Sequence, residues 1–294
     1  MTWPARVAIV GAGTMGVGIA RVFGSHGIPS VLADVTPERA EAAAASAAEE
    51  HVTAAASVEA AVDGADLVVE AVVERSDVKL DVYAEIEAAA ADDAVVATNT
   101  SSIPIAELSK WVQRPERFLG MHWFVPPLLV PCVEVIPGPS TGEYVVTQVV
   151  EALTRLGKAA VVVGDGPGFV ANRIQFAMFR EAARIVEDGL ATPEQVDEVV
   201  RSSFGYRLPF FGPFTIADMA GLDVYADIFE TLEDGLGSRF AAPRILREHV
   251  ERGELGVKSG RGFLGLSQAE GEELIDRRNR AYVGLAGLRR EVEA

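Results

Sequence analysis

Short apolar runs alternate with longer, mixed stretches through the first half of the chain. Runs of this length, bounded by polar or glycine-rich residues, are typical of strands buried in a sheet. Because several of them are apolar without a break, both faces of the sheet are expected to be covered. The expected strands are residues 5–10, 30–33, 66–73, 94–98, 118–123, 132–136 and 159–163.

Helices are expected between these strands, over residues 14–26, 36–50 and 77–90. Thr36 is a candidate N-cap of the second helix, and Pro37 suits its first turn. Strands that alternate with helices form parallel βα units. The predicted fold class is therefore α/β, with a Rossmann-type, doubly wound and mostly parallel sheet.

The segment Ala40–Ala61 is rich in alanine. Alanine is the best helix former, so the segment is interpreted as helix rather than as disorder. Between Asp34 and Asp66 the chain has room for one helix and a short strand. No internal repeat interrupts this pattern.

The pattern changes after residues 164–169, GDGPGF, where strand-like alternation gives way to helical periodicity. Gly and Pro punctuate the chain here, which predicts a domain boundary. We expect a dinucleotide-binding domain over residues 1–166 and an all-α substrate and dimerisation domain over 167–294. A last helix is expected over 268–292, whose apolar face either covers the core or meets a partner subunit.

The 294 residues carry a formal charge of −17, which disfavours nucleic acid as a partner. The single cysteine, Cys132, rules out an intrachain disulfide and suits a reducing compartment. Neither a signal peptide nor an apolar stretch approaching the roughly 20 residues of a membrane span is recognised. We expect a cytoplasmic protein without a membrane partner.

The first expected strand leads into Gly11-Ala-Gly13-Thr14-Met15-Gly16, which matches the G-x-G-x-x-G pattern. In the context of a strand before it and a helix after it, the pattern indicates a dinucleotide site. The first glycine allows a tight turn, the second lets the backbone approach a pyrophosphate, and the third lets the helix pack on the strand. The pyrophosphate would lie at a helix N-terminus.

Asp34 ends the second expected strand, where the dinucleotide fingerprint places an acid. A carboxylate there hydrogen-bonds ribose hydroxyls and repels a 2′-phosphate, which favours NAD over NADP. Arg39, one turn into the next helix, weakens that preference slightly. The alternative is a glycine turn without a ligand and an Asp that caps a helix.

His122 stands at the end of one expected strand, and Glu134 lies in the next. Ligands of open α/β sheets bind at the carboxyl edge, and neighbouring strands would bring the two side chains together. A carboxylate beside an imidazole orients the ring and raises its basicity, which suits a general base for alcohol oxidation. The other three histidines, His26, His51 and His249, are interpreted as structural or solvated.

These features belong to a longer series of motifs that resembles the 3-hydroxyacyl-CoA dehydrogenase family. The motifs follow the order of the family and span nearly the whole chain: GAGTMGVGIA (11–20), DLVVEAVVE (66–74), Lys79, NTSSI (99–103), GMHWF (120–124), VEVI (133–136), GDGPGFVANR (164–173), FGPF (211–214), AGLD (220–223) and GVKSGRGF (256–263).

The resemblance implies roles for individual residues. His122 would be the general base and Glu134 its partner, while Ser101 and Asn172 would be polar groups at the substrate. Glu74, Lys79 and Asn99 match positions that line the cofactor site. Alternatives remain open: Ser101 or Ser102 would also suit the cap of a following helix, and Asn172 would suit a backbone partner near the Pro-Gly bend. A homodimer through the helical half is also implied, and no metal.

The chain departs from the family at two places. Val125 stands where the family usually has an asparagine, and an apolar side chain cannot hydrogen-bond a substrate or orient Glu134. The residues between Asp34 and Asp66 are too few for the helical hairpin that helps the acyl-CoA enzymes to hold coenzyme A. They carry one base, Arg39, among acids: Glu38, Glu41, Glu49, Glu50, Glu59, Asp63 and Asp66.

Coenzyme A presents a phosphorylated ADP, which favours Arg or Lys in its site. The predicted function is therefore NAD-dependent oxidation or reduction of a 3-hydroxy acid or a 3-hydroxyacyl derivative. The alternatives are a dehydrogenase of a small free hydroxy acid or of a carrier-bound acyl group, and a non-catalytic dinucleotide-binding protein.

Overall fold

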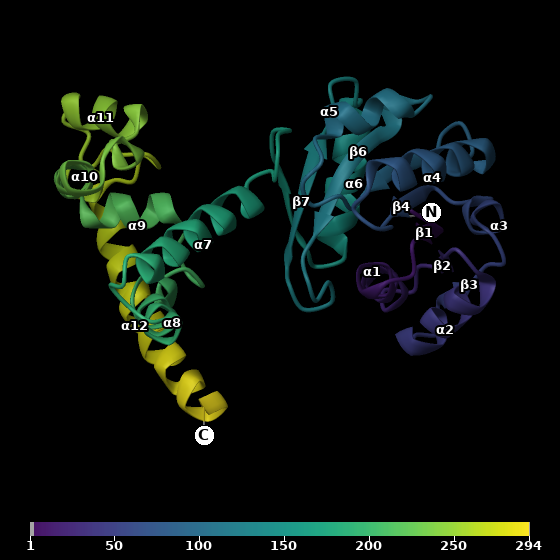
Figure 1. Ribbon diagram of the computed structural model, residues 1–294, viewed down its shortest axis with the longest axis horizontal. Coiled ribbons are helices and arrows are strands. Elements are labelled where there is room, and N and C mark those ends of the chain that lie inside the picture. Colours follow the sequence, from purple (N-terminus) through teal and green to yellow (C-terminus); the bar gives the residue numbers. More distant parts are fainter. Residues whose placement is uncertain (1–2, 294) are drawn as a thin grey trace. The chain divides into compact units, whose positions relative to one another are not determined.

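The computed structural model describes residues 3–293, which form two compact units divided after Phe179 (Figure 1). The first unit is built on one eight-stranded sheet with the order β3-β2-β1-β4-β5-β6-β7-β8. Its strands are β1 Val7–Val10, β2 Ser30–Ala33, β3 Val52–Ala54, β4 Leu67–Glu70, β5 Val95–Thr98, β6 Phe118–Trp123, β7 Cys132–Pro137 and β8 Ala159–Val162.

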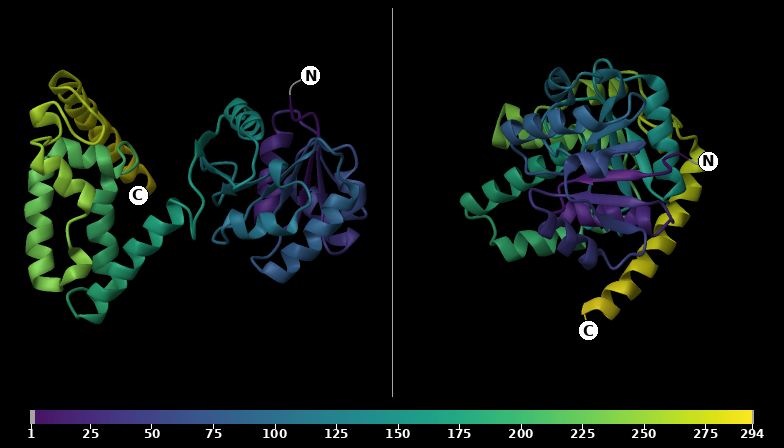
Figure 2. Two further views of the ribbon diagram at one scale, coloured as in Figure 1. Left: turned by 90° about the horizontal axis from the view of Figure 1, so that it is seen from above. Right: turned by 90° about the vertical axis from the view of Figure 1, so that its right-hand side faces the viewer.

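Every neighbouring pair of strands is parallel except β6 and β7, which are antiparallel. Six helices cover the two faces of the sheet (Figure 2). One face carries α1 Thr14–Gly24, α2 Pro37–Ala47 and α6 Glu143–Arg155. The other carries α3 Val58–Val62, α4 Ser76–Ala89 and α5 Ile105–Leu108. The predicted doubly wound, mostly parallel sheet is thus confirmed.

The core of this unit follows from the period of two along each strand. In β1, Val7 and Ile9 pack against α1 and α2, while Ala8 and Val10 pack on the opposite face. All four side chains are buried, which explains why the strand is apolar without a break.

The interpretation of Ala40–Ala61 as one helix is wrong beyond Ala47. Ala48 has a left-handed backbone with φ of 51°, and the chain then forms β3, where Val52 pairs with Ser30 of β2. Edge pairing of the β-branched residues here outweighs the helix propensity of the alanines. Ser57 then caps α3 by accepting a hydrogen bond from the Ala60 amide at 3.1 Å.

The other expected elements differ from the observed ones mainly at their ends. Thr36 caps α2 as predicted, accepting from the Arg39 amide at 3.4 Å. The strand expected over 66–73 ends at Glu70, because the Glu70 side chain accepts from the Val72 amide and turns the chain out of the sheet.

The second unit is helical. The helix α7 Ala171–Glu187 begins in the first unit and ends in the second. The others are α8 Pro193–Ser202, α9 Pro213–Ala220, α10 Leu222–Leu236, α11 Arg244–Glu251 and α12 Gln268–Glu293. Short 3-10 helices also occur: η1 Ser109–Trp111, η2 Pro115–Arg117, η3 Phe204–Tyr206, η4 Ser238–Phe240 and η5 Val257–Ser259. The domain boundary expected at residue 167 lies before the division between the two compact units, which follows Phe179. The expected boundary stays a prediction.

The expected C-terminal helix is α12. Tyr282 packs within the unit, with its ring 5.5 Å from that of Tyr206. Farther along the helix, Leu288 and Val292 are exposed. No helix in residues 3–293 combines the length and the apolar character that crossing a bilayer requires.

Candidate active site

The antiparallel pairing of β6 and β7 places His122 directly opposite Glu134. Their side chains therefore leave the same face of the sheet, and the two atoms His122 Nδ1 and Glu134 Oε2 lie 2.8 Å apart. Both residues are buried. The structure thus brings together the histidine and the carboxylate that the sequence predicts as a pair.

The second oxygen of Glu134 is also engaged. Oε1 accepts hydrogen bonds from the amides of Val170 and Ala171, at 3.1 and 3.0 Å, where α7 begins. A helix N-terminus with free amides favours a negative charge. The Glu134 side chain is therefore fixed on one side by the start of α7 and on the other by the imidazole.

The imidazole of His122 lies between two aromatic rings. Its centroid is 4.6 Å from that of Phe124 and 5.7 Å from that of Phe169. With Nδ1 directed to Glu134, the second ring nitrogen, Nε2, has no hydrogen-bond partner among residues 3–293. This arrangement orients the ring and leaves one nitrogen for a substrate.

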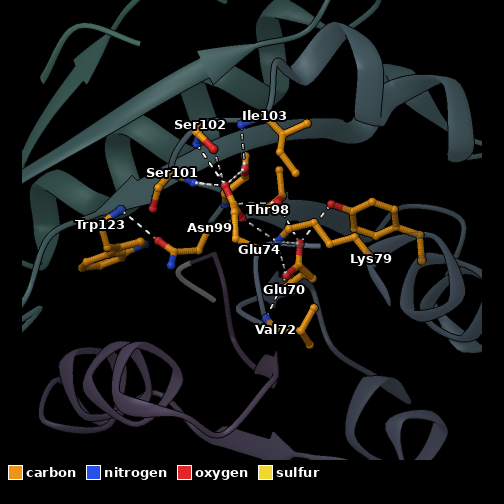
Figure 3. Close-up of polar contacts among 12 residues, drawn as sticks. Glu70, Val72, Glu74, Lys79, Thr98, Asn99, Ser101, Ser102, Ile103 and Trp123 are labelled. Atoms are coloured by element: carbon orange, nitrogen blue, oxygen red, sulfur yellow. Dashed lines mark hydrogen bonds and ion pairs between the residues drawn. The ribbon is translucent and has the colours of Figure 1, made fainter. Parts of the chain in front are cut away.

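Glu74 organises the loop that follows β5 (Figure 3). Its Oε1 atom accepts from the Thr100 hydroxyl at 2.6 Å and from the amides of Ser101 and Ser102 at 2.8 and 3.0 Å. Burial alone would raise the pKa of Glu74. The hydrogen bonds and the charge of Lys79 outweigh it, so the pKa lies below its ordinary value. Glu74 is therefore ionised at neutral pH and holds Ser101 in place.

Lys79 lies beneath Glu74 and has no exposed surface. Its ammonium group donates to both oxygens of Glu70, at 2.8 and 3.0 Å, and lies 3.4 Å from Glu74. A side chain buried in this way cannot touch a cofactor, in contrast to the cofactor-lining position that the resemblance implies. Lys79 instead acts on the site by holding Glu74.

Glu70 is a residue that the sequence analysis missed. It also accepts from the hydroxyls of Tyr83 and Thr98, at 2.9 and 2.7 Å. Burial, with the nearby charge of Glu70, raises the pKa of Tyr83 well above its usual range. The available signal was an acid inside an otherwise apolar strand, since ionisable residues are seldom fully buried unless they are paired.

The predicted polar residues around the loop also have defined partners. The Asn172 side-chain amide donates to the backbone carbonyl of Ser101 at 2.8 Å. The side-chain oxygen of Asn99, Oδ1, accepts from the backbone amide of Trp123 at 3.0 Å. The Ser101 hydroxyl makes no hydrogen bond within the described residues. Neither serine caps α5, because Asp165 accepts from both of the first amides of that helix.

The loop that follows β6 is apolar and exposed at its tip. Val125, the departure from the family, has 64% of its surface exposed. Lys158 anchors the loop from below: its ammonium group donates to the carbonyls of Pro127 and Val130 and lies 5.7 Å from the Trp123 ring centroid. Burial lowers the pKa of Lys158.

The glycine turn between β1 and α1 has the expected shape. Gly11 has φ of +104°, and a Cβ atom there would lie 2.6 Å from the backbone of Ala71. A Cβ on Gly16 would lie 1.9 Å from the Gly11 carbonyl oxygen. At Gly13 nothing lies within 4 Å of a Cβ position, and this residue caps α1 without a side-chain bond. Thr14 and Met15 then form the first turn of α1.

A cavity of about 540 Å³ adjoins this turn. Asp34 lies on its wall at the end of β2, and apolar side chains, among them Val58, Val78 and Val82, form much of the rest. An open glycine turn, a carboxylate and apolar walls are what the phosphates, ribose and adenine of a dinucleotide require. The residues present fit this group, and together with the His122–Glu134 pair they define a nicotinamide-dinucleotide dehydrogenase.

Comparison with known proteins agrees with this class and narrows it. Residues 6–56 and 42–166 match the model of the 3-hydroxyacyl-CoA dehydrogenase NAD binding domain, and residues 168–265 match that of the C-terminal domain. The chain therefore belongs to the 3-hydroxyacyl-CoA dehydrogenase family. It is an NAD-dependent dehydrogenase that acts on a CH–OH group.

This chain is similar to relatives that are named for two different substrates, a pyridine carboxylate and an acyl-CoA. A 5-formyl-3-hydroxy-2-methylpyridine 4-carboxylate 5-dehydrogenase of Mesorhizobium japonicum is 36% identical, over 95% of this chain and 96% of its own. A probable 3-hydroxybutyryl-CoA dehydrogenase of Bacillus subtilis is 36% identical, over 88% and 96%. The crystal structure of a 3-hydroxyacyl-CoA dehydrogenase from Archaeoglobus fulgidus, 33% identical, superposes with a TM-score of 0.84 over 96% of this chain and 99% of that one.

Proposed function

We propose that this dehydrogenase oxidises the hydroxyl group of a 3-hydroxy acid or a 3-hydroxyacyl derivative, with His122 as the general base. The observation that carries the proposal is the buried pair of His122 and Glu134, with one imidazole nitrogen left for a substrate. In the reverse direction the same nitrogen would return the proton.

Oxidation of a secondary alcohol removes a proton from oxygen and a hydride from carbon, and a carbonyl group remains. His122 Nε2 takes the proton. Glu134 accepts the hydrogen bond from Nδ1 and stabilises the imidazolium that forms. Because two backbone amides already fix the carboxylate, little reorganisation accompanies this change of charge.

Bound NAD supplies the acceptor for the hydride. Gly11, Gly13 and Gly16 would hold its phosphates at the turn before α1, and Asp34, on the wall of the cavity, would hold the ribose. Ser101, whose hydroxyl has no partner within the described residues, would orient the reacting oxygen. Asn172 supports it through the Ser101 carbonyl.

A small free hydroxy acid is a second candidate substrate, and two observations favour it. The Mesorhizobium japonicum relative, similar over nearly its full length, is named for a substituted pyridine carboxylate. The residues from β2 to β4 form only α2, β3 and α3, and their charged side chains are mostly acidic, which disfavours the phosphates of coenzyme A.

A substrate panel separates these candidates. NADH formation is measured with 3-hydroxybutyryl-CoA, its short pantetheine thioester, free 3-hydroxybutyrate and a hydroxymethyl-substituted aromatic acid. We expect turnover of at least one 3-hydroxy compound. Binding of NADH without turnover of any of them would instead support a non-catalytic dinucleotide-binding protein.

The role of His122 is tested with a matched pair of variants. His122→Gln should lower kcat/KM by about 100-fold or more, since general base catalysis contributes roughly 100- to 10,000-fold. His249 also lies beside a glutamate, Glu254, at 2.7 Å, but in the helical unit. His249→Gln should leave turnover within about twofold, because His249 pairs with Glu254 and packs on Phe263 rather than on the residues proposed to act on the substrate. Equal losses in both variants would refute the assignment.

We also propose that two copies associate through the helical unit. Few of its apolar side chains are fully buried, while several on α8 and α12 are exposed, among them Val199, Val283 and Val292. A monomer with so much exposed apolar surface is unusual. Light scattering on the purified protein should give twice the chain mass, whereas a monomer at micromolar concentration would contradict the proposal.

A further inference from the structure

The carboxylate that selects the dinucleotide is already occupied. Asp34 Oδ2 accepts from the Ala12 amide at 2.8 Å, and Oδ1 accepts from the Val35 amide at 2.8 Å. The Nε atom of Arg39 lies 3.0 Å from Oδ1 as well. Only 8% of the Asp34 side chain is exposed. Its charge is therefore directed into the protein and is paired.

Arg39 has the opposite character. Its side chain is 64% exposed, and within residues 3–293 the guanidinium contacts no acid other than Asp34. Because the ion pair uses Nε, the two terminal amino groups of the guanidinium keep their donors. Arg39 and Asp34 line the same cavity, together with Gly11 and Gly13.

Arg39 also lines a second cavity, of about 590 Å³, which shares Gly13 with the first. This groove lies between α1 and α2, where Arg21 and Ser46 contribute to it. The guanidinium thus stands at the junction of the dinucleotide cavity and an open groove. A group that projects from the ribose beside Asp34 has space there.

The physical consequence concerns the 2′-position of the adenine ribose. An unpaired carboxylate excludes a 2′-phosphate by repulsion, whereas a paired one presents almost no net charge. A guanidinium with spare donors is the group that binds phosphate best. Glu85 lines the same cavity, but it is exposed, so that water and salt screen its charge.

We propose that this site accepts NADP as well as NAD, and that Arg39 is the residue that binds the 2′-phosphate. Asp34 remains the partner of the ribose in NAD, and the Asp34–Arg39 pair lets one site serve both cofactors. The inference concerns the choice of cofactor and does not depend on the substrate or on the role of His122.

The test measures binding of cofactor fragments, which needs no turnover. Titration calorimetry with adenosine 5′-monophosphate and adenosine 2′,5′-bisphosphate isolates the 2′-phosphate, because the two ligands differ by that group alone. For the unaltered protein we expect dissociation constants within about tenfold of each other, a difference of at most ~1.4 kcal/mol.

Arg39→Met should weaken the bisphosphate by about tenfold or more, the range of a charge-assisted hydrogen bond. The dissociation constant of the monophosphate should stay within about threefold of that of the unaltered protein, which shows that the variant is folded. Arg21→Met is the matched control, because Arg21 lines the groove but not the dinucleotide cavity. It should change neither ligand by more than about twofold.

Two outcomes overturn the proposal. One is an unaltered protein that binds the bisphosphate about 100-fold or more weakly than the monophosphate, which means that Asp34 still excludes the 2′-phosphate. The other is an Arg39→Met variant that weakens both ligands equally, which assigns Arg39 to the fold of α2 rather than to the phosphate. If the affinity of the unaltered protein for the bisphosphate falls as salt is added, and that of Arg39→Met does not, the contact between Arg39 and the 2′-phosphate is supported.

Discussion

The side-chain amide of Asn172 donates a hydrogen bond to the backbone carbonyl of Ser101, 71 residues earlier in the chain. The bond joins the first turn of α7 to the loop after β5. The same turn of α7 supplies the Ala171 amide to Glu134, the partner of His122. The two groups proposed to act on the reacting oxygen are therefore positioned by one short stretch of α7.

This contact predicts the behaviour of Asn172→Ala. Loss of this partly buried hydrogen bond removes about 1 kcal/mol, so the Ser101 loop should loosen and kcat/KM should fall about five- to tenfold. Steady-state kinetics with the best substrate of the panel measure the effect. Asn279, an exposed asparagine on α12, provides the control, and Asn279→Ala should leave kcat/KM unchanged. A structural role elsewhere would instead lower the yield of folded protein and leave kcat/KM intact.

The hydrogen bonds of Glu74 to the loop after β5 predict that the stability of the protein depends on pH. The pKa of Glu74 is depressed in the folded protein, so the stability that it contributes is present above the unfolded pKa, about 4.5. That contribution is lost as the pH falls through the lower folded value. Urea unfolding at pH 6 and pH 3.5 should show a smaller loss of stability for Glu74→Gln than for the unaltered protein.

A suitable control for this experiment is Glu107, an exposed acid on α5 whose one ion pair within the described residues is with Lys110. Glu107→Gln should keep the full acid dependence of the unaltered protein. If Glu74→Gln and Glu107→Gln lose stability equally on acidification, Glu74 does not hold the loop by its charge.

Replacement of Lys158 is expected to lower the free energy of unfolding. Lys158→Met keeps the aliphatic stem but leaves the carbonyls of Pro127 and Val130 without their donor and removes the contact with the Trp123 ring. Unsatisfied buried groups cost roughly 1–3 kcal/mol, so the urea midpoint should fall accordingly. The exposed Lys110 offers a comparison, and Lys110→Met should move the midpoint by less than about 0.5 kcal/mol in equivalent free energy. An unchanged midpoint for Lys158→Met would show that the anchor is dispensable.

Much of the first unit was predictable because its signals are local. The run VAIV followed by the glycine turn specifies β1 and the start of α1, and Asp34 is found by its distance from that turn. His122 and Glu134 are also accessible to sequence reasoning, since each is an ionisable residue within an apolar strand. Their opposition also requires β6 and β7 to be antiparallel, which the short connection between Trp123 and Cys132 favours, because parallel strands need a crossover of about a dozen residues or more.

The remaining features depend on contacts between distant residues. Nothing within the alanine-rich segment reveals that Val52 pairs with Ser30, so propensity alone extends the helix too far. Likewise, the complete burial of Lys79 follows from its pairing with Glu70, nine residues before it on another element. The engagement of Asp34 by Arg39 is visible from their spacing, but its geometry is not.

The Glu70–Lys79 pair has a consequence for the history of this chain. With both side chains fully buried, exchange of Lys79 alone leaves Glu70 without its counter-ion, and exchange of Glu70 alone leaves Lys79 with the more distant Glu74. Breaking a buried pair in this way costs roughly 3–5 kcal/mol and thus a large share of the stability of an ordinary domain. Joint replacement by apolar residues avoids that loss. These two positions should therefore be inherited together, and natural variants should differ at both or at neither.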